Sequence, residues 1–185
     1  MMKKATTLIL AAILLLGILT GCNAEDTPMT HIAVVGADHA NSRDLPLTGE
    51  STTKLVDQMC RTGGQLTLIT TEGNVRVVDT VKTDKPDSSL TTTRQDQIVE
   101  ANTHKILSWI ERKAIATTPE LDVLSAVQKG ARALADQEGN RYMILCSTLL
   151  STVDPLDFRN NLLDADPVEI TDKLQEMGEI PDLKE

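Results

Sequence analysis

The sequence predicts an α/β fold in three layers, in which helices cover both faces of a mostly parallel sheet that has one antiparallel hairpin at its edge. Two unbroken apolar runs, residues 31–37 and 142–147, have the length and aliphatic composition of interior strands buried on both faces. Residues 66–70 and 75–81 are also strand-like, and the short link between them allows only an antiparallel hairpin. Aromatic residues make up 2% of the chain, so aliphatic side chains must build the core.

The strands have a predicted order across the sheet. The outer strand of the hairpin lies at one edge, followed by its inner strand, the run at 31–37 and the run at 142–147. Two helices are predicted before the second run from apolar side chains at helical spacing. One runs to Cys60 with Ser51 or Thr52 as its cap, and the other spans residues 94–116.

Proline marks the start of three further predicted helices, because its fixed φ suits the first helical turn. Pro119 begins one of them, with Thr118 as its cap and Gly139 at its end. The Asp-Pro pairs at 154–155 and 166–167 supply an acidic cap followed by proline. These pairs open short helices over residues 156–163 and 168–177.

The pattern leaves the far side of the fourth strand, residues 142–147, without a neighbouring strand. Either the two short helices cover that edge, as their apolar side chains favour, or the edge pairs with another chain. An α/β pattern would offer a further strand after Gly178, so the domain looks truncated after its fourth strand.

The first residues have the three parts of a signal peptide. Lys3 and Lys4 precede an apolar run at 8–19, which is too short to span a bilayer, and small residues follow it. The tetrapeptide LTGC resembles the lipobox of bacterial lipoproteins. That resemblance implies cleavage after Gly21 and a diacylglyceryl group on Cys22, hence an extracytoplasmic protein anchored in the cell membrane. An ordinary secretory peptide with a chance cysteine is the alternative.

Three segments follow from this: a lipoprotein signal peptide at 1–21, a tether at 22–30 and an α/β domain at 31–185. Removal of the signal peptide reduces 18 basic residues to 16 against 27 acidic residues, a net charge of −11. Nucleic acid and anionic lipid both attract basic patches, so neither is expected to bind this domain by charge. The membrane affinity must therefore come from the lipid.

Three stretches of the domain are informative together: "IAVVGADHANS" at the first strand, "TTPELDVLSAVQKGARAL" at the later helix and "RYMILCS" at the fourth strand. They resemble the von Willebrand factor A domain, a Rossmann-like fold, and the likeness covers roughly residues 30–178. Ligands of open α/β sheets bind at the carboxyl ends of the strands. The candidate ligand face comprises Asp38, Asn41, Ser42, Thr118 and Ser147.

The family holds a metal ion at this face through a DxSxS motif, a threonine and an aspartate after the fourth strand. Here Asp38 and Ser42 match the ends of the motif, Ala40 replaces the middle serine, and Thr117 or Thr118 could supply the threonine. The aspartate is missing. Mg²⁺ usually takes one or two carboxylates, so the resemblance implies a degenerate site that binds divalent metal weakly if at all. A turn held by Asx and Ser hydrogen bonds is the alternative for residues 38–42.

Neither a phosphate-binding glycine loop nor a nucleophile elbow is found in the sequence. Cys60 and Cys146 are expected to be buried thiols, and a disulfide between them is the alternative. The predicted function is a non-catalytic binding or adhesion module that meets a cell-envelope protein or a cell-wall partner. The alternative is an envelope enzyme, or a binder of small ligands or metal, that uses the same crevice.

Overall fold

The computed structural model describes residues 27–36, 47–115, 118–160 and 162–180. In chain order the elements are β1 (Thr30–Val35), α2 (Glu50–Thr62), β2 (Gly64–Ile69), β3 (Val77–Thr83), α3 (Thr92–Lys113), α4 (Val123–Ala135), β4 (Asn140–Leu145), the 3-10 turns η1 (Phe158–Asn160) and η2 (Leu162–Asp164), and α5 (Pro167–Glu176). Among these described elements, no helix has both the length and the apolar composition required to cross a membrane.

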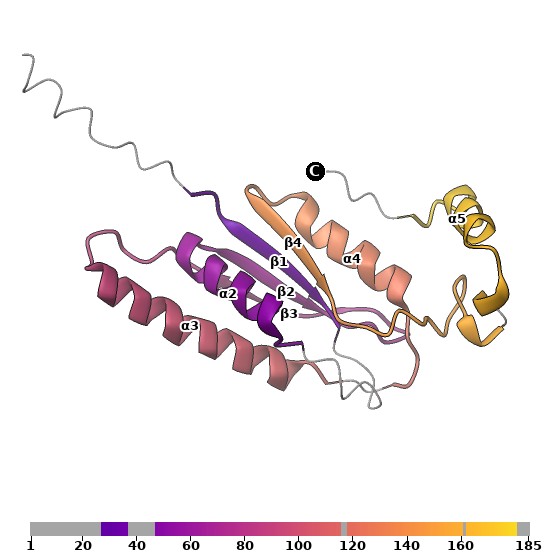
Figure 1. Cartoon of the computed structure of the whole chain (residues 1–185), viewed down its shortest axis with the longest axis horizontal. Helices are drawn as coiled ribbons and strands as arrows, with labels where there is room; N and C mark the ends of the chain where they lie inside the picture. The colour runs from indigo at the N-terminus through magenta and orange to yellow at the C-terminus, as the bar shows by residue number, and fades with distance from the viewer. Residues whose placement is uncertain (1–26, 37–46, 116–117, 161, 181–185) are drawn as a thin grey trace, which may run out of the picture.

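The four described strands form one mixed sheet in the order β3-β2-β1-β4 (Figure 1). β1 lies parallel to β2 on one side and to β4 on the other, and β2 and β3 form the antiparallel pair. The predicted strand order and the edge position of the hairpin are therefore confirmed. The arrangement is an α/β fold consistent with a Rossmann-like sheet.

Side chains of β1 alternate between two helical layers, as the pleat of a strand requires. Ile32 and Val34 pack with side chains of α2 and α3 on one face of the sheet. Ala33 and Val35 pack on the opposite face, where α4 contributes Ala126. Every residue of β1 is buried, which confirms that its unbroken apolar run marks an interior strand.

The prediction that the fourth strand is an interior strand buried on both faces is wrong. β4 lies at the edge of the described sheet, and none of its six residues is fully buried. Both faces of β4 are only partly covered. Met143 packs beside the apolar cluster that includes Ala126 of α4, and Ile144 lies at the margin of the cluster formed with α2 and α3 on the other face. Apolar composition therefore identified the strand correctly but overstated how far its two faces are buried.

The first two helices begin before their predicted starts. α2 has Gly49 at its N-cap, and the hydroxyl of Thr53 donates to the Gly49 carbonyl at 3.1 Å, so Ser51 and Thr52 lie inside the helix. α3 begins at Thr92, because the side chain of Thr91 accepts the backbone N–H of Arg94. α3 also ends at Lys113 with Ala114 as its C-cap, before the predicted end at residue 116.

α4 begins later than its predicted start at Pro119. Asp122 is the N-cap and accepts the backbone N–H of Ser125 at 3.0 Å. Leu121 stays extended before it, because its N–H donates to Thr152 Oγ1 at 2.8 Å and its carbonyl accepts the N–H of Thr152. These long-range hydrogen bonds replace the first turn that proline would otherwise favour, so Thr118 is not a cap.

The two Asp-Pro pairs have different outcomes. Asp166 caps α5 by accepting the N–H of Val168 at 2.8 Å, Pro167 occupies the first turn, and Gly178 follows with φ +71°, so this helix is confirmed. The helix predicted over residues 156–163 is wrong, since the chain forms only η1 and η2 there. The carboxylate of Asp157 accepts two donors of the next residues and thereby closes a turn instead.

The short helices do not cover the free edge of β4. α5 has no buried residue and packs extensively against none of the described helices and strands. In Figure 1 it lies at the far end of the molecule, beyond the start of α4. Gln128 of α4 donates to the carbonyl of Glu179 at 2.7 Å, so the segment after α5 meets α4 rather than β4. The predicted covering of the edge is therefore wrong.

Candidate functional site

The three parallel strands end together at one edge of the sheet, which we call the strand-end edge and define as Gly36, residues 70–72 and residues 146–147. The N–H of Gly36 donates to the Ile69 carbonyl at 2.9 Å, and the N–H of Cys146 donates to the Val35 carbonyl at 2.8 Å. A Cβ on Gly36 would collide with the side chain of Leu47 and crowd Cys146. The Leu47 side chain would have to move, and the Cys146 carbonyl oxygen would lie 3.1 Å from the added Cβ, which is tighter than usual packing.

The structure describes two of the five residues predicted to form the ligand face. Asp38, Asn41 and Ser42 lie outside the described residues. Thr118 is exposed, and Ser147 is half-buried directly after β4. The Ser147 hydroxyl accepts the N–H of Leu149 at 3.2 Å, and Leu149 has φ +64°, so Ser147 organises a tight turn. Within the described residues, no hydrogen bond joins Thr118 to Ser147.

A set of hydrogen bonds that the sequence analysis missed lies beside this edge. We call it the polar clasp and define it as Thr71, Leu121, Asp122, Ser151 and Thr152. The N–H of Asp122 donates to the Thr71 carbonyl at 2.7 Å, and the Ser151 hydroxyl donates to the Leu121 carbonyl at 2.9 Å. The clasp ties the end of β2, the start of α4 and the segment after β4 into one unit.

Two acidic residues lie next to the clasp. Glu72, 4% exposed, forms an isolated antiparallel bridge with Leu121. Asp157, 8% exposed, accepts the backbone N–H and the guanidinium of Arg159, which also donates to the carbonyl of Thr152. The Arg159 guanidinium holds the pKa of the Asp157 carboxyl below its usual value. Asp157 is thus an ionised structural group that fixes the loop after β4.

No local sequence pattern pointed to this clasp. In the sequence, Thr71 and Glu72 have the pattern of turn residues in a hairpin, and Ser151 and Thr152 have the pattern of a polar loop. Their partners are far away in the chain, so the hydrogen bonds emerge only once the sheet has formed. The Asp-x-Arg spacing at 157–159 was the one readable signal, since it places a carboxylate within reach of a guanidinium.

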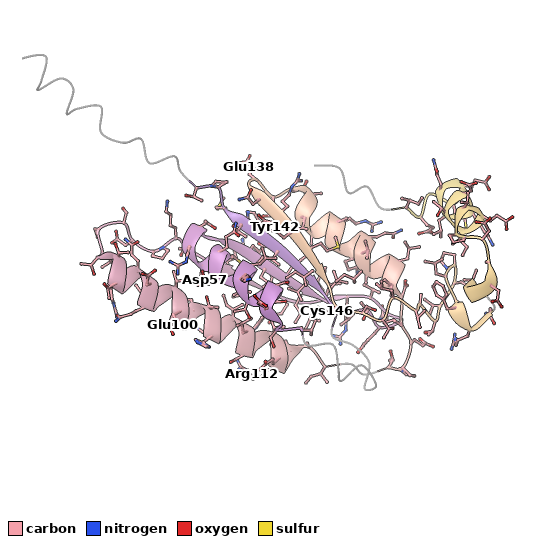
Figure 2. The ribbon with its side chains drawn as sticks, in the orientation of Figure 1. Asp57, Glu100, Arg112, Glu138, Tyr142 and Cys146 are labelled. Carbon is pink, nitrogen blue, oxygen red and sulfur yellow. The ribbon has the colours of Figure 1, made fainter. Side chains whose placement is uncertain are left out.

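Cys60 and Cys146 are thiols that do not form a disulfide, so the disulfide alternative does not apply. Cys60 is fully buried in α2, and burial raises the pKa of its thiol, which leaves it protonated and unreactive at neutral pH. Cys146 is half-buried at the carboxyl end of β4 (Figure 2). The polar groups described at and beside the strand-end edge are therefore hydroxyls, backbone amides and carbonyls, and the Asp157 carboxylate that pairs with Arg159.

In the parts of the chain that the structure describes, no three His, Cys, Asp or Glu side chains are grouped to hold a metal ion. Asp38 and Ser42, two of the expected ligands, lie outside those parts. The weak or absent metal binding stays a prediction.

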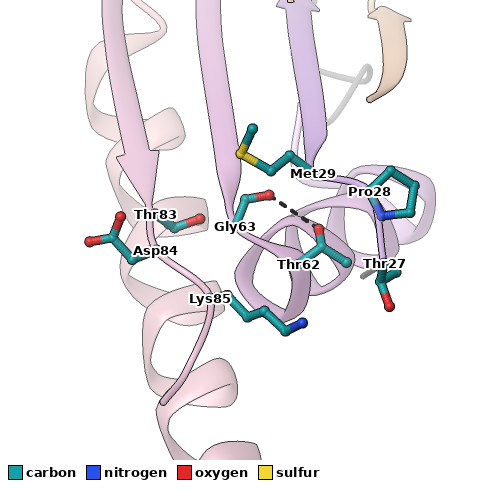
Figure 3. Close-up of a pocket in the computed structure, with 8 residues that line it drawn as sticks. All are labelled: Thr27, Pro28, Met29, Thr62, Gly63, Thr83, Asp84 and Lys85. Carbon is teal, nitrogen blue, oxygen red and sulfur yellow. Dashed lines mark hydrogen bonds between the residues drawn. The ribbon is translucent and has the colours of Figure 1, made fainter. Parts of the chain in front are cut away.

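A hollow lies at the opposite end of the sheet, where the chain enters β1 (Figure 3). Its volume is about 400 Å³, and Thr62, Thr83, Asp84 and Lys85 line it together with residues 27–29 and Gly63. The hydroxyl of Thr83 donates to the Met59 carbonyl at 3.2 Å, and that of Thr62 bonds to the Thr30 hydroxyl at 3.0 Å. These two hydroxyls are therefore already engaged within the fold.

Comparisons of this chain with models of protein families, with curated proteins and with solved structures found no match. The geometry of the strand-end edge and the sequence motifs therefore carry the functional argument.

Proposed function

We propose that this chain is a lipid-anchored protein of the bacterial cell envelope whose α/β domain is a non-catalytic binding module. The domain is of the von Willebrand factor A type in this proposal, and the sheet order β3-β2-β1-β4 with its antiparallel edge supports that assignment. The partner is an envelope protein or a cell-wall polymer, and it meets the strand-end edge.

One observation carries the binding role. β1, β2 and β4 all point their carboxyl ends to the same edge, which is where open α/β sheets bind ligands. The polar clasp fixes this edge from three directions, so the loops that leave it start from a rigid base. Rigid bases under exposed loops are typical of binding surfaces.

The charged groups described near the edge favour binding over catalysis. The Asp157 carboxylate is neutralised by the Arg159 guanidinium. General acid–base catalysis needs a titratable group whose pKa lies near the working pH and which can reach the substrate. Ser147 uses its hydroxyl to accept a backbone N–H, so it is engaged in a turn rather than with a general base.

The lipid anchor is inferred from the LTGC sequence. Substitution of Cys22, with substitution of Cys146 as the control, tests it. Cys22→Ser should lose the mass of the lipid and leave the membrane fraction or stay unprocessed, whereas Cys146→Ser should behave like the wild type. Mass spectrometry and membrane fractionation measure both. Equal mass and equal membrane partition for Cys22→Ser and the wild type would contradict the anchor.

The binding edge is tested with two exposed threonines. Thr118→Arg places a bulky cation in the segment before α4, near the expected face, and Thr93→Arg places the same group in the first turn of α3 as a control. Photo-crosslinking to intact envelopes should fall for Thr118→Arg and stay unchanged for Thr93→Arg. Equal crosslinking of the two variants would remove the strand-end edge from the proposal.

The effect of metal ions on thermal stability distinguishes the proposed binding module from the alternative, a metal-dependent binder or enzyme. An intact site would stabilise the fold by about 2.7 kcal/mol at a hundredfold excess of metal over its Kd. Thermal melts in Mg²⁺, Mn²⁺ and EDTA should instead nearly coincide. A rise of several degrees that disappears in Asp38→Ala would favour the alternative.

A further inference from the structure

The outer side of β4 presents backbone groups that nothing described in the structure pairs. The N–H groups of Asn140 and Cys146 donate toward β1, to the carbonyls of Met29 and Val35. In a parallel ladder the direction alternates from residue to residue, so Arg141, Met143 and Leu145 direct their N–H and carbonyl groups outward. Among the described strands, β4 has β1 as its one neighbour.

The apolar side chains of β4 are only partly buried. Tyr142, Met143 and Ile144 are half-buried, and Leu145 is 37% exposed. Figure 2 labels Tyr142 on β4. Exposed strand edges of this kind are templates for another strand, and proteins usually protect them with charges or covers.

The other edge of the sheet is protected in that way. β3 carries Asp79 and Lys82, and Asp79 forms an ion pair with Lys113 at 3.3 Å. β4 carries a single charged residue, Arg141, and no acidic residue. For a chain whose net charge is −9, two β4 strands therefore meet without bringing carboxylates of their own together, and β4 lacks the charged pair that protects β3.

We propose that β4 pairs antiparallel with β4 of a second copy of this chain, with Met143 on the two-fold axis. In this register Arg141 lies opposite Leu145 of the second copy, and Met143 lies opposite its own counterpart. All three outward-facing residues then exchange hydrogen bonds in both directions, roughly six in total. The two sheets become one continuous sheet with an isologous interface.

Side-chain pairing in this register also favours the second copy as the occupant. Tyr142 lies opposite Ile144 of the second copy, and the two-fold axis repeats this aromatic and β-branched pair, which is among the favourable cross-strand pairs. No two like charges face each other, because Arg141 pairs with Leu145. The interface is between copies of the domain and does not depend on the strand-end edge or on the lipid.

Proline at Leu145 tests the pairing. Leu145→Pro removes an outward N–H that makes no bond within one copy, and proline is tolerated at such positions of edge strands. Leu145→Ala is the matched control, because it shortens the side chain and keeps the N–H. We expect sedimentation of the full chain in mild detergent to show a wild-type dimer, with dimerisation weakened about tenfold or more by Leu145→Pro and less by Leu145→Ala.

Hydrogen exchange of the wild type gives a second readout that needs no variant. Exchange at Met143 and Leu145 should be fast in dilute protein and slow in concentrated protein. A wild type that stays monomeric at high concentration would overturn the proposal, as would a dimer that Leu145→Pro leaves intact. Protection independent of concentration would place a segment of the same chain on the edge, and protection that requires envelope extract would place another protein there, and both would overturn it as well.

Discussion

β1 and β4 are neighbouring parallel strands of six residues each, and both are rich in aliphatic side chains, yet they occupy different environments. All residues of β1 are buried between α2, α3 and α4, with a strand on either side. β4 has β1 on one side alone, and its residues are half-buried or exposed. The difference shows that burial depends on the number of neighbours a strand has, which its own composition does not encode.

Proline substitution should show the largest difference between the two strands. Val34→Pro places a proline in a central strand, where it removes a ladder hydrogen bond between β1 and β2 and cannot be accommodated, so we expect the chain not to fold. Leu145→Pro should cost little in the monomer, because that N–H faces outward. Far-UV circular dichroism and urea unfolding measure both variants.

The control for this comparison is Val34→Ala, which separates loss of the side chain from loss of the N–H. It should fold with reduced stability. If Val34→Pro and Leu145→Pro were equally stable, the inner and outer strands would not differ as their hydrogen bonding indicates.

Truncation of one isoleucine on each strand should give the next largest effect. Ile32 is 1% exposed, whereas Ile144 packs only at the margin of the same apolar cluster. Ile32→Ala should lower the free energy of unfolding by about 2–5 kcal/mol, and Ile144→Ala by roughly half as much or less. Urea unfolding at equal protein concentration compares the two, and similar losses would mean that β4 is as well packed as β1.

The comparison of β1 with β4 also explains what the sequence could predict. The short link at 71–74 forced a hairpin, and the apolar run at 31–37 required cover on both faces, so the strand order followed. The partial burial of β4 could not be predicted, because it depends on whether the chain after Ser147 packs back onto the sheet. The same holds for the start of α4, which Thr71 and Thr152 fix from distant parts of the chain.

The candidate site was predictable only in its location. Strand ends of a parallel sheet meet at one edge by geometry, so that edge could be named from the strand order. The side chains that order it could not, because Ser151 and Asp157 act through bonds to distant or locally folded backbone. Asp38, Asn41 and Ser42 lie outside the described residues, and their roles stay predictions.

Removal of two equivalent helix caps should distinguish the core from the C-terminal region, with a smaller effect. Asp122 caps α4, which packs on the sheet, and Asp166 caps α5, which has no buried residue. Asp122→Ala should cost about 1 kcal/mol of global stability, while Asp166→Ala should loosen α5 without changing the global unfolding midpoint. Urea unfolding and hydrogen exchange in α5 measure the two effects, and an equal loss of global stability would show that α5 is part of the cooperative core.

The smallest expected effect is a dependence on pH that arises after β4 and has no counterpart in β1. The guanidinium and the backbone N–H of Arg159 hold the pKa of the Asp157 carboxyl below its unfolded value. The unfolded chain therefore binds a proton at this group more readily than the folded chain. The stabilisation that the ionised Asp157 gives the fold is fully present above the unfolded pKa, near 4, and is lost as the pH falls through the folded pKa.

Asp157→Asn should flatten the fall in stability below about pH 5 and leave the thermal unfolding midpoint at pH 7 lowered. Arg159→Gln should flatten it in the same way, because the carboxyl then returns toward its ordinary pKa. Thermal melts between neutral and acid pH measure both variants, and an acid limb as steep as that of the wild type would mean that this pair contributes nothing to the stability of the region after β4.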